Sequence, residues 1–148
     1  MNSTDVEQSI GFLLADISRL IRKLADRRLT AIELTRVQCH ALMSLNQFGP
    51  LAQATLAGVM DVETATMARL LARMEETGWI ERSGGQRDRR VKLVSMSDKA
   101  AAVMDRIAEI ARALDADIVA DLTRQQRETL TESMGAMKSR LNQLLSAE

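Results

Sequence analysis

The fold can be inferred most directly from residues 79–96, which read WIERSGGQRDRRVKLVSM. The runs 79–82 and 91–96 have the short, apolar-rich composition of β-strands, and the glycines between them predict a hairpin turn. Four of the six residues from 87 to 92 are arginine or lysine. We therefore expect this hairpin to meet a negatively charged partner.

The residues before the hairpin have the pattern of packed helices. A helix capped by Thr35 is expected to reach about residue 47, where Gly49 and Pro50 impose a turn. A short helix is expected over 51–59 and a longer one over 63–77. The longer helix has one apolar stripe and a glycine after its end, namely Met67, Leu70, Leu71, Met74 and Gly78. Two packed helices followed by a hairpin describe a winged helix-turn-helix.

Amphipathic helices are predicted on both sides of this segment. Capping-box patterns begin at Thr4 and Thr123, and a further helix is expected from about Ser97. Their apolar residues recur at helical spacing, as Val6, Ile10, Leu13, Ile17, Leu20 and Leu24, then Val103, Ile107, Ile110, Leu114 and Ile118, then Leu130, Met134, Met137, Leu141 and Leu144. Such narrow seams predict partner helices and therefore a homodimer.

These patterns predict a mainly α fold with a small β-hairpin, a winged helix-turn-helix flanked by N- and C-terminal dimerisation helices. The expected division is 1–34 for the N-terminal dimerisation helix, 35–96 for the winged helix-turn-helix and 97–148 for the C-terminal dimerisation helices. A chain of 148 residues is large enough to bury a core without disulfides or metals.

Composition limits the classes of function. Twenty Lys plus Arg balance twenty Asp plus Glu, so any basic surface must be local. The single cysteine, Cys39, cannot form an internal disulfide, and we expect it to be a small buried residue; a redox-sensing thiol is the alternative. The N-terminus lacks a secretory signal, and no apolar run approaches the roughly 20 residues that span a bilayer. We expect a cytoplasmic protein without a membrane segment.

The helix over 63–77 has a smooth and basic exposed face. Ala65, Ala68, Arg69, Ala72 and Arg73 lie opposite or beside its apolar stripe. The candidate DNA-binding residues of this helix are Thr64, Ala65, Thr66, Arg69 and Arg73. Small side chains allow the helix to approach a DNA groove, where threonines and arginines can bond base edges or phosphates. The alternative is an ordinary solvated helix, since alanine and arginine have high helix propensity.

The hairpin turn contains the second set of candidate DNA-binding residues, Arg87, Asp88, Arg89 and Arg90. Asp88 is placed to accept hydrogen bonds from Arg90 and so to orient its guanidinium. An oriented arginine on a slim hairpin suits a narrow minor groove. The alternative is a charged loop that keeps an edge hairpin in solution.

Several of these segments resemble the MarR family of bacterial transcriptional regulators, nearest its SlyA/RovA-like branch. The resemblance rests on ATMARLL at 65–71, on EETGWI at 75–80 and above all on DRRVKLVSMS at 88–97. It implies a homodimer that binds a pseudo-palindromic DNA operator, with Arg90 entering a minor groove and Arg69 acting on the recognition helix. It also implies a small aromatic effector, such as a phenolic anion, bound between the dimerisation helices and the winged helix.

An enzyme is not expected. The one histidine, His40, adjoins Cys39 on a helix, where neighbouring side chains point about 100° apart. No phosphate-binding glycine loop or metal-ligand spacing occurs, so no catalytic residue, cofactor or metal is predicted. The rival function is a winged-helix module that binds an acidic protein or RNA without sequence-specific duplex binding.

Overall fold

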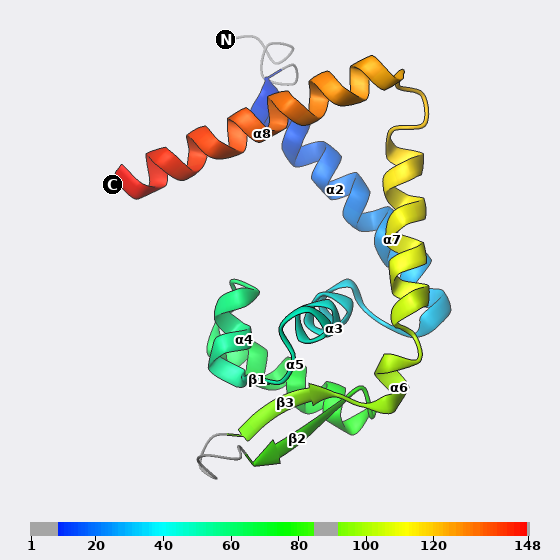
Figure 1. The fold of residues 1–148 in the computed structure, drawn as a ribbon, viewed down its shortest axis with the longest axis vertical. Helices are drawn as coiled ribbons and strands as arrows, with labels where there is room; N and C mark the ends of the chain where they lie inside the picture. The colour runs from blue at the N-terminus through cyan, green and yellow to red at the C-terminus, as the bar shows by residue number, and fades with distance from the viewer. Residues whose placement is uncertain (1–8, 85–91, 148) are drawn as a thin grey trace. The chain divides into compact units, whose positions relative to one another are not determined.

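The computed structural model describes residues 9–84 and 92–147 (Figure 1). Its elements in chain order are α2 (Ile10–Leu29), a 3₁₀ turn (Thr30–Ile32), α3 (Arg36–Phe48), β1 (Leu51–Ala52), α4 (Gln53–Val59), α5 (Thr64–Glu76), β2 (Ile80–Gly84), β3 (Lys92–Met96), α6 (Asp98–Ala101), α7 (Met104–Ile118) and α8 (Arg124–Ala147). The predicted mainly α fold with a small β-hairpin is confirmed.

The chain forms two compact units, Met1–Arg112 and Ala113–Glu148. The first contains every element from α2 to α6 and most of α7. The second contains the end of α7 and all of α8. The helix-turn-helix and the sheet therefore belong to the first unit.

The sheet is antiparallel with strand order β1-β3-β2, so β3 is its central strand. Across the hairpin, Ile80 pairs with Met96 and Gly84 with Lys92. On the other side Leu51 pairs with Val94. The prediction of a helix beginning at Leu51 is therefore wrong: Leu51–Ala52 is a strand, and α4 begins at Gln53. Pairing with Leu93 and Val94 of β3, more than 40 residues away, overrides the local helical signal.

One apolar core joins the helices of the first unit to the sheet. The predicted stripe of α5 is buried, with Met67, Leu71 and Met74 at 0% exposure and Leu70 partly buried. It packs in a cluster with Leu42 of α3, Leu56 of α4 and Val94 of β3. Burial of such side chains contributes about 1.5–3 kcal/mol each, so this core positions α5.

Two of the predicted helix caps are confirmed. Thr35 and Gln38 form the capping box of α3, and Thr123 and Gln126 exchange the same two hydrogen bonds before α8. At the N-terminus, α2 begins at Ile10 and Ser9 accepts the capping hydrogen bond from Phe12. The predicted start at Thr4 lies outside the described residues.

The helix expected from Ser97 is two helices. A helix does begin there, as predicted: Ser97 caps α6 by accepting a hydrogen bond from the Ala100 amide. The Val103 amide then donates to the carbonyl of Ala100, three residues back, and α7 begins at Met104. This tighter step separates α6 from α7.

Helix α5 ends in a Schellman motif that contains Gly78. The Trp79 amide donates to Met74 O at 2.8 Å, and the Gly78 amide donates to Glu75 O at 3.0 Å. Gly78 has φ +75°, the left-handed region that this motif requires. Met74 and Trp79, the two apolar residues that flank the motif, are both buried.

Replacement of Gly78 by alanine is expected to lower the free energy of unfolding by about 1 kcal/mol. A Cβ at this position meets no atom within 4 Å, so the cost is backbone strain alone. Gly58, inside α4 and equally uncrowded, supplies the matched control. Gly58→Ala should leave stability unchanged or raise it by up to about 1 kcal/mol. Urea denaturation of both variants measures the difference, and equal effects would contradict the assignment of strain to Gly78.

Candidate nucleic-acid interface

Helices α4 and α5 form a helix-turn-helix whose turn is locked by backbone hydrogen bonds. The Val62 amide donates to Ala57 O at 3.0 Å and the Asp61 amide to Gly58 O at 3.2 Å. Asp61 has φ +52°, so an aspartate occupies the left-handed position here. This arrangement is a second Schellman motif, and it sets where α5 begins.

The predicted recognition-helix residues are exposed side chains of α5. Thr64, Ala65, Thr66, Arg69 and Arg73 are all exposed, and Ala65, Arg69 and Arg73, four residues apart, share the face away from the buried stripe. The first three occupy the opening turn, and the arginines follow one and two turns later. The start of α5 therefore presents small side chains to solvent, and the next two turns present cations.

Two details describe the polar groups of this face. The N-cap residue Glu63 makes no side-chain hydrogen bond to the first turn of α5. A helix start of this kind presents backbone N–H groups and a partial positive charge. Arg69 Nε donates to Ala65 O at 3.4 Å, so this guanidinium lies back along its own helix.

The base of the hairpin is joined to α5 by an ion pair. Arg82 Nε of β2 lies 3.3 Å from Glu75 Oε2 of α5. Within the described chain, that nitrogen has no partner with hydrogen-bond geometry, so the contact is an electrostatic one. The predicted turn residues Arg87, Asp88, Arg89 and Arg90 lie outside the described residues.

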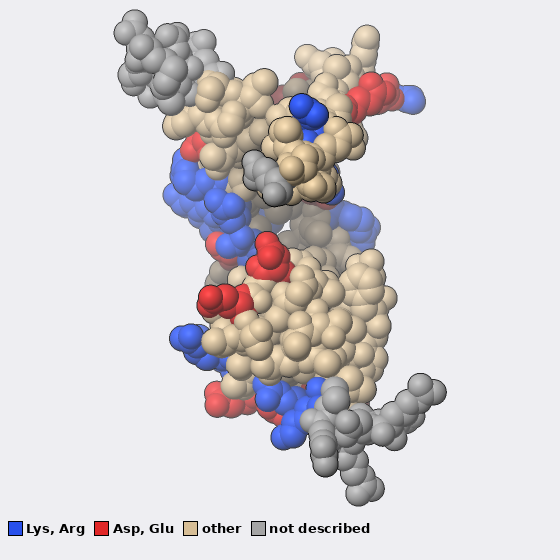
Figure 2. Space-filling view, turned by 90° about the vertical axis from the view of Figure 1, so that its left-hand side faces the viewer, with Lys and Arg blue, Asp and Glu red and all other residues tan. Residues whose placement is uncertain are grey.

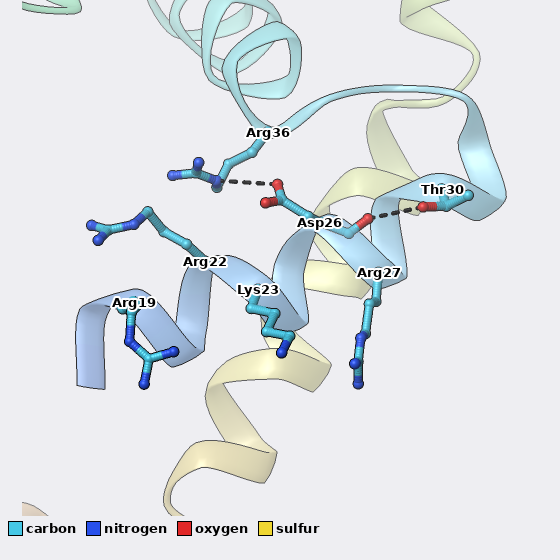
Figure 3. Close-up of a pocket in the computed structure, with 7 residues that line it drawn as sticks. All are labelled: Arg19, Arg22, Lys23, Asp26, Arg27, Thr30 and Arg36. Atoms are coloured by element: carbon cyan, nitrogen blue, oxygen red, sulfur yellow. Dashed lines mark hydrogen bonds and ion pairs between the residues drawn. The ribbon is translucent and has the colours of Figure 1, made fainter. Parts of the chain in front are cut away.

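A basic hollow on the first unit was not singled out by the sequence. It has a volume of about 480 Å³ and is lined by Arg19, Arg22, Lys23, Asp26, Arg27, Thr30 and Arg36. All come from α2 and the turn after it except Arg36, which begins α3. Arg22 and Arg36 point to the same side in Figure 3, whereas Arg19, Lys23 and Arg27 follow the other side of α2.

The hollow has a local excess of positive charge. Arg19 pairs with Asp16 at 2.6 Å, and Arg36 Nε lies 3.3 Å from Asp26 Oδ1. Among the described residues, Arg22, Lys23 and Arg27 have no carboxylate within ion-pair distance, and Arg22 Nη1 donates to Ser18 Oγ at 2.8 Å. The corresponding gathering of lysine and arginine side chains lies over α2 at mid-height in Figure 2. This surface favours anions.

The sequence signal for the hollow was a row of cations four residues apart, Arg19, Lys23 and Arg27. Such a row shares one helix face. It resembles an ordinary solvated face of α2, and only the fold brings Arg36 beside Arg22 on the other side of that helix. Only the tertiary structure therefore distinguishes this basic hollow from an ordinary solvated helix face.

Cys39 is buried, as predicted, with 5% of its surface exposed. Burial raises the pKa of its thiol to about 11, because the thiolate would lose its hydration. The thiol is therefore protonated at neutral pH. No group of three or more His, Cys, Asp or Glu within 9–84 and 92–147 is arranged to hold a metal ion. The helices in these ranges include none long and apolar enough to cross a membrane.

Comparison with known proteins identifies the helix-turn-helix segment. Residues 34–92 match the sequence profile of the MarR family. A probable transcriptional regulator from Pseudomonas aeruginosa is 28% identical, with a TM-score of 0.78, over 89% of this chain and 98% of its own.

Two structures solved with DNA have the same fold. A cysteine-to-serine mutant of MarR from E. coli, complexed with operator DNA, is 21% identical over 93% of this chain and 99% of its own, with a TM-score of 0.80. The S. aureus MepR–DNA complex is 23% identical over 91% and 98%, with a TM-score of 0.76. This protein therefore carries a MarR family domain over residues 34–92, within the winged-helix fold of MarR-type regulators.

Proposed function

We propose that this protein is a bacterial transcription regulator of the MarR family, of its SlyA/RovA-like branch, that binds double-stranded DNA as a homodimer. The observation that carries the proposal is the exposed face of α5, which follows a locked helix-turn-helix and presents Thr64, Thr66, Arg69 and Arg73 together. Such a regulator acts in the cytoplasm, where bacterial DNA lies. It needs no catalytic residue and no cofactor.

Recognition of the duplex is assigned to two elements. Helix α5 enters the major groove, where Thr64, Ala65 and Thr66 approach base edges and Arg69 and Arg73 reach guanines or phosphates. Its uncapped first turn supplies N–H groups for a phosphate oxygen. In the hairpin turn, Asp88 orients Arg90 into the minor groove, and Arg87 and Arg89 contact phosphates.

Dimerisation is assigned to the residues outside 35–96, namely 1–34 and 97–148. On α2 the side chains of Ile10, Leu13, Ile17 and Leu20 are about half exposed, as are those of Leu130, Met134, Leu141 and Leu144 on α8. Apolar stripes of this length on charged helices are typical of surfaces that another helix covers. A second copy of the chain supplies that helix in our proposal, and two-fold symmetry then gives a pseudo-palindromic operator.

An anionic effector is assigned to the basic hollow of α2 and α3. The hollow is open to solvent, and its cations without a carboxylate partner in the described chain favour a carboxylate or phenolate. The hollow joins the predicted dimerisation helix to the first helix of the winged domain. An anion that binds one arrangement of these elements more tightly shifts the population away from the operator-binding one.

The main test of DNA recognition is the replacement of Arg90. Arg90→Ala is expected to cost about 1–3 kcal/mol of operator affinity, as a specific contact is lost. Asp88→Ala should weaken binding in part, although it removes a negative charge, because Arg90 loses its orientation. Arg89→Ala should weaken operator and scrambled duplexes equally and lower the salt slope by about one. Fluorescence anisotropy across a salt series measures all three.

Controls for this experiment are the unmodified protein on both duplexes and circular dichroism of each variant. Equal and weak binding of operator and scrambled DNA would favour the rival function, a winged-helix adaptor for protein or RNA. An Arg90→Ala variant that binds the operator normally would contradict the role of the hairpin.

The dimer is tested by a matched pair of substitutions on α8. Leu141→Glu places a charge in the apolar stripe, where Leu141 is 56% exposed in the single chain. It should raise the dimer dissociation constant at least about tenfold, since each copy loses one leucine that the proposed interface covers. Gln143→Glu adds the same charge at a neighbouring exposed position outside the stripe and should have no effect. Sedimentation equilibrium gives the constants, and a monomer that binds the operator with full affinity would refute the dimer.

The effector site is tested with salicylate, a phenolic carboxylate, against neutral benzyl alcohol. Salicylate at millimolar concentration should weaken operator binding, whereas benzyl alcohol should not. Arg22→Gln should reduce salicylate affinity by roughly tenfold or more, because one charge-assisted hydrogen bond is worth about 1.5–3 kcal/mol. Arg112→Gln removes an exposed arginine of α7 and serves as the control. Unchanged salicylate binding by the Arg22 variant, measured calorimetrically, would remove the hollow as the site.

A further inference from the structure

The exit of α5 is fastened to the start of α6 by hydrogen bonds to three successive carbonyl groups. Lys99 Nζ donates to Thr77 O at 2.8 Å, Ser97 Oγ donates to Gly78 O at 2.7 Å, and the Ser97 amide donates to Trp79 O at 3.2 Å. We call this set of contacts the α5–α6 clasp. It joins segments about 20 residues apart in the chain.

The clasp adds something that the Schellman motif of α5 cannot supply. The amides of Gly78 and Trp79 bond carbonyls of α5 itself, so these two bonds end the helix without attaching it to another element. The three bonds of the clasp come from residues that precede or begin α6. They therefore restrain the end of α5 relative to the chain that leads into α7.

Lys99 makes a second contact in the clasp. Its ammonium lies 4.0 Å from the centre of the Trp79 ring, within the range of a cation–π interaction. Trp79 itself is 5% exposed and belongs to the core, whereas Lys99 is exposed. Lys99 thus contacts both the end of α5 and the buried Trp79 ring from the protein surface. Because Lys99 is exposed, its replacement leaves the core intact.

We propose that Lys99 is a positioning residue for DNA recognition, holding the exit of α5 so that Arg69 and Arg73 meet the duplex in register. The inference rests on the proposed DNA-binding function. Arg73 lies one turn before Thr77, the residue whose carbonyl Lys99 holds. Loosening this end changes the tilt of α5 and moves its C-terminal arginines most. The start of α5 stays held by the Asp61 turn.

The test compares three variants on an operator that the unmodified protein has selected from random duplexes. Lys99→Met keeps the unbranched stem and removes the ammonium. It should weaken operator binding about three- to tenfold while the slope of log affinity against log salt stays unchanged. Lys99→Arg, which can donate to the same carbonyl and lie over the same ring, should restore most of the affinity. Lys138→Met makes the same charge change on exposed α8 and should bind like the unmodified protein.

Tryptophan fluorescence reports on the clasp without DNA, because Trp79 is the single tryptophan of the chain. Acrylamide quenching of Trp79 should increase in Lys99→Met and not in Lys99→Arg. Increased quenching with unchanged operator affinity would overturn the proposal, since the clasp would then be structural only. A salt slope lower by about one, with equal losses on operator and scrambled DNA, would also overturn it, because Lys99 would then contact a phosphate directly.

Failure of the proposed function has a different signature. In that case the unmodified protein selects no duplex at all, and neither do the variants at position 99. Failure of the positioning role requires an unmodified protein that binds its operator and a Lys99→Met variant that binds equally well.

Discussion

Burial of the apolar stripe of α5 is the interaction on which the rest of the first unit depends. Met67, Leu71 and Met74 are fully buried among residues of α3, α4 and β3. Because a helix has one buried face, this packing also determines which side chains α5 presents to solvent. The same hydrophobic contacts that stabilise the unit therefore select Thr64, Thr66, Arg69 and Arg73 as its outward groups.

A chain without net charge can still have separate surfaces of local positive charge. Its cations gather on the outward face of α5 and in the hollow beside α2, and four of them are close together in the sequence over 87–92. Acidic residues neutralise some of them, as Asp16 does for Arg19 and Glu75 does at Arg82. Local pairing therefore decides which cations remain available, whereas total composition does not.

Much of the architecture follows from local sequence, and the departures have tertiary causes. The capping pairs Thr35/Gln38 and Thr123/Gln126 and the stripe of α5 were predicted because each depends on residues within one or two helical turns. The strand at Leu51 was missed because its partner, Val94, is remote. The basic hollow was missed because Arg36 comes from a different helix. The roles of Arg87, Asp88, Arg89 and Arg90 stay predictions.

The strand order β1-β3-β2 has a consequence for how copies of this chain can associate. The central strand, β3, has partners on both sides, and one outer strand, β1, is only two residues long. The other outer strand, β2, carries the charged pair Glu81 and Arg82. Short or charged outer strands resist the addition of a further strand from another molecule. Growth of this sheet into fibres by the addition of strands from other copies is therefore disfavoured.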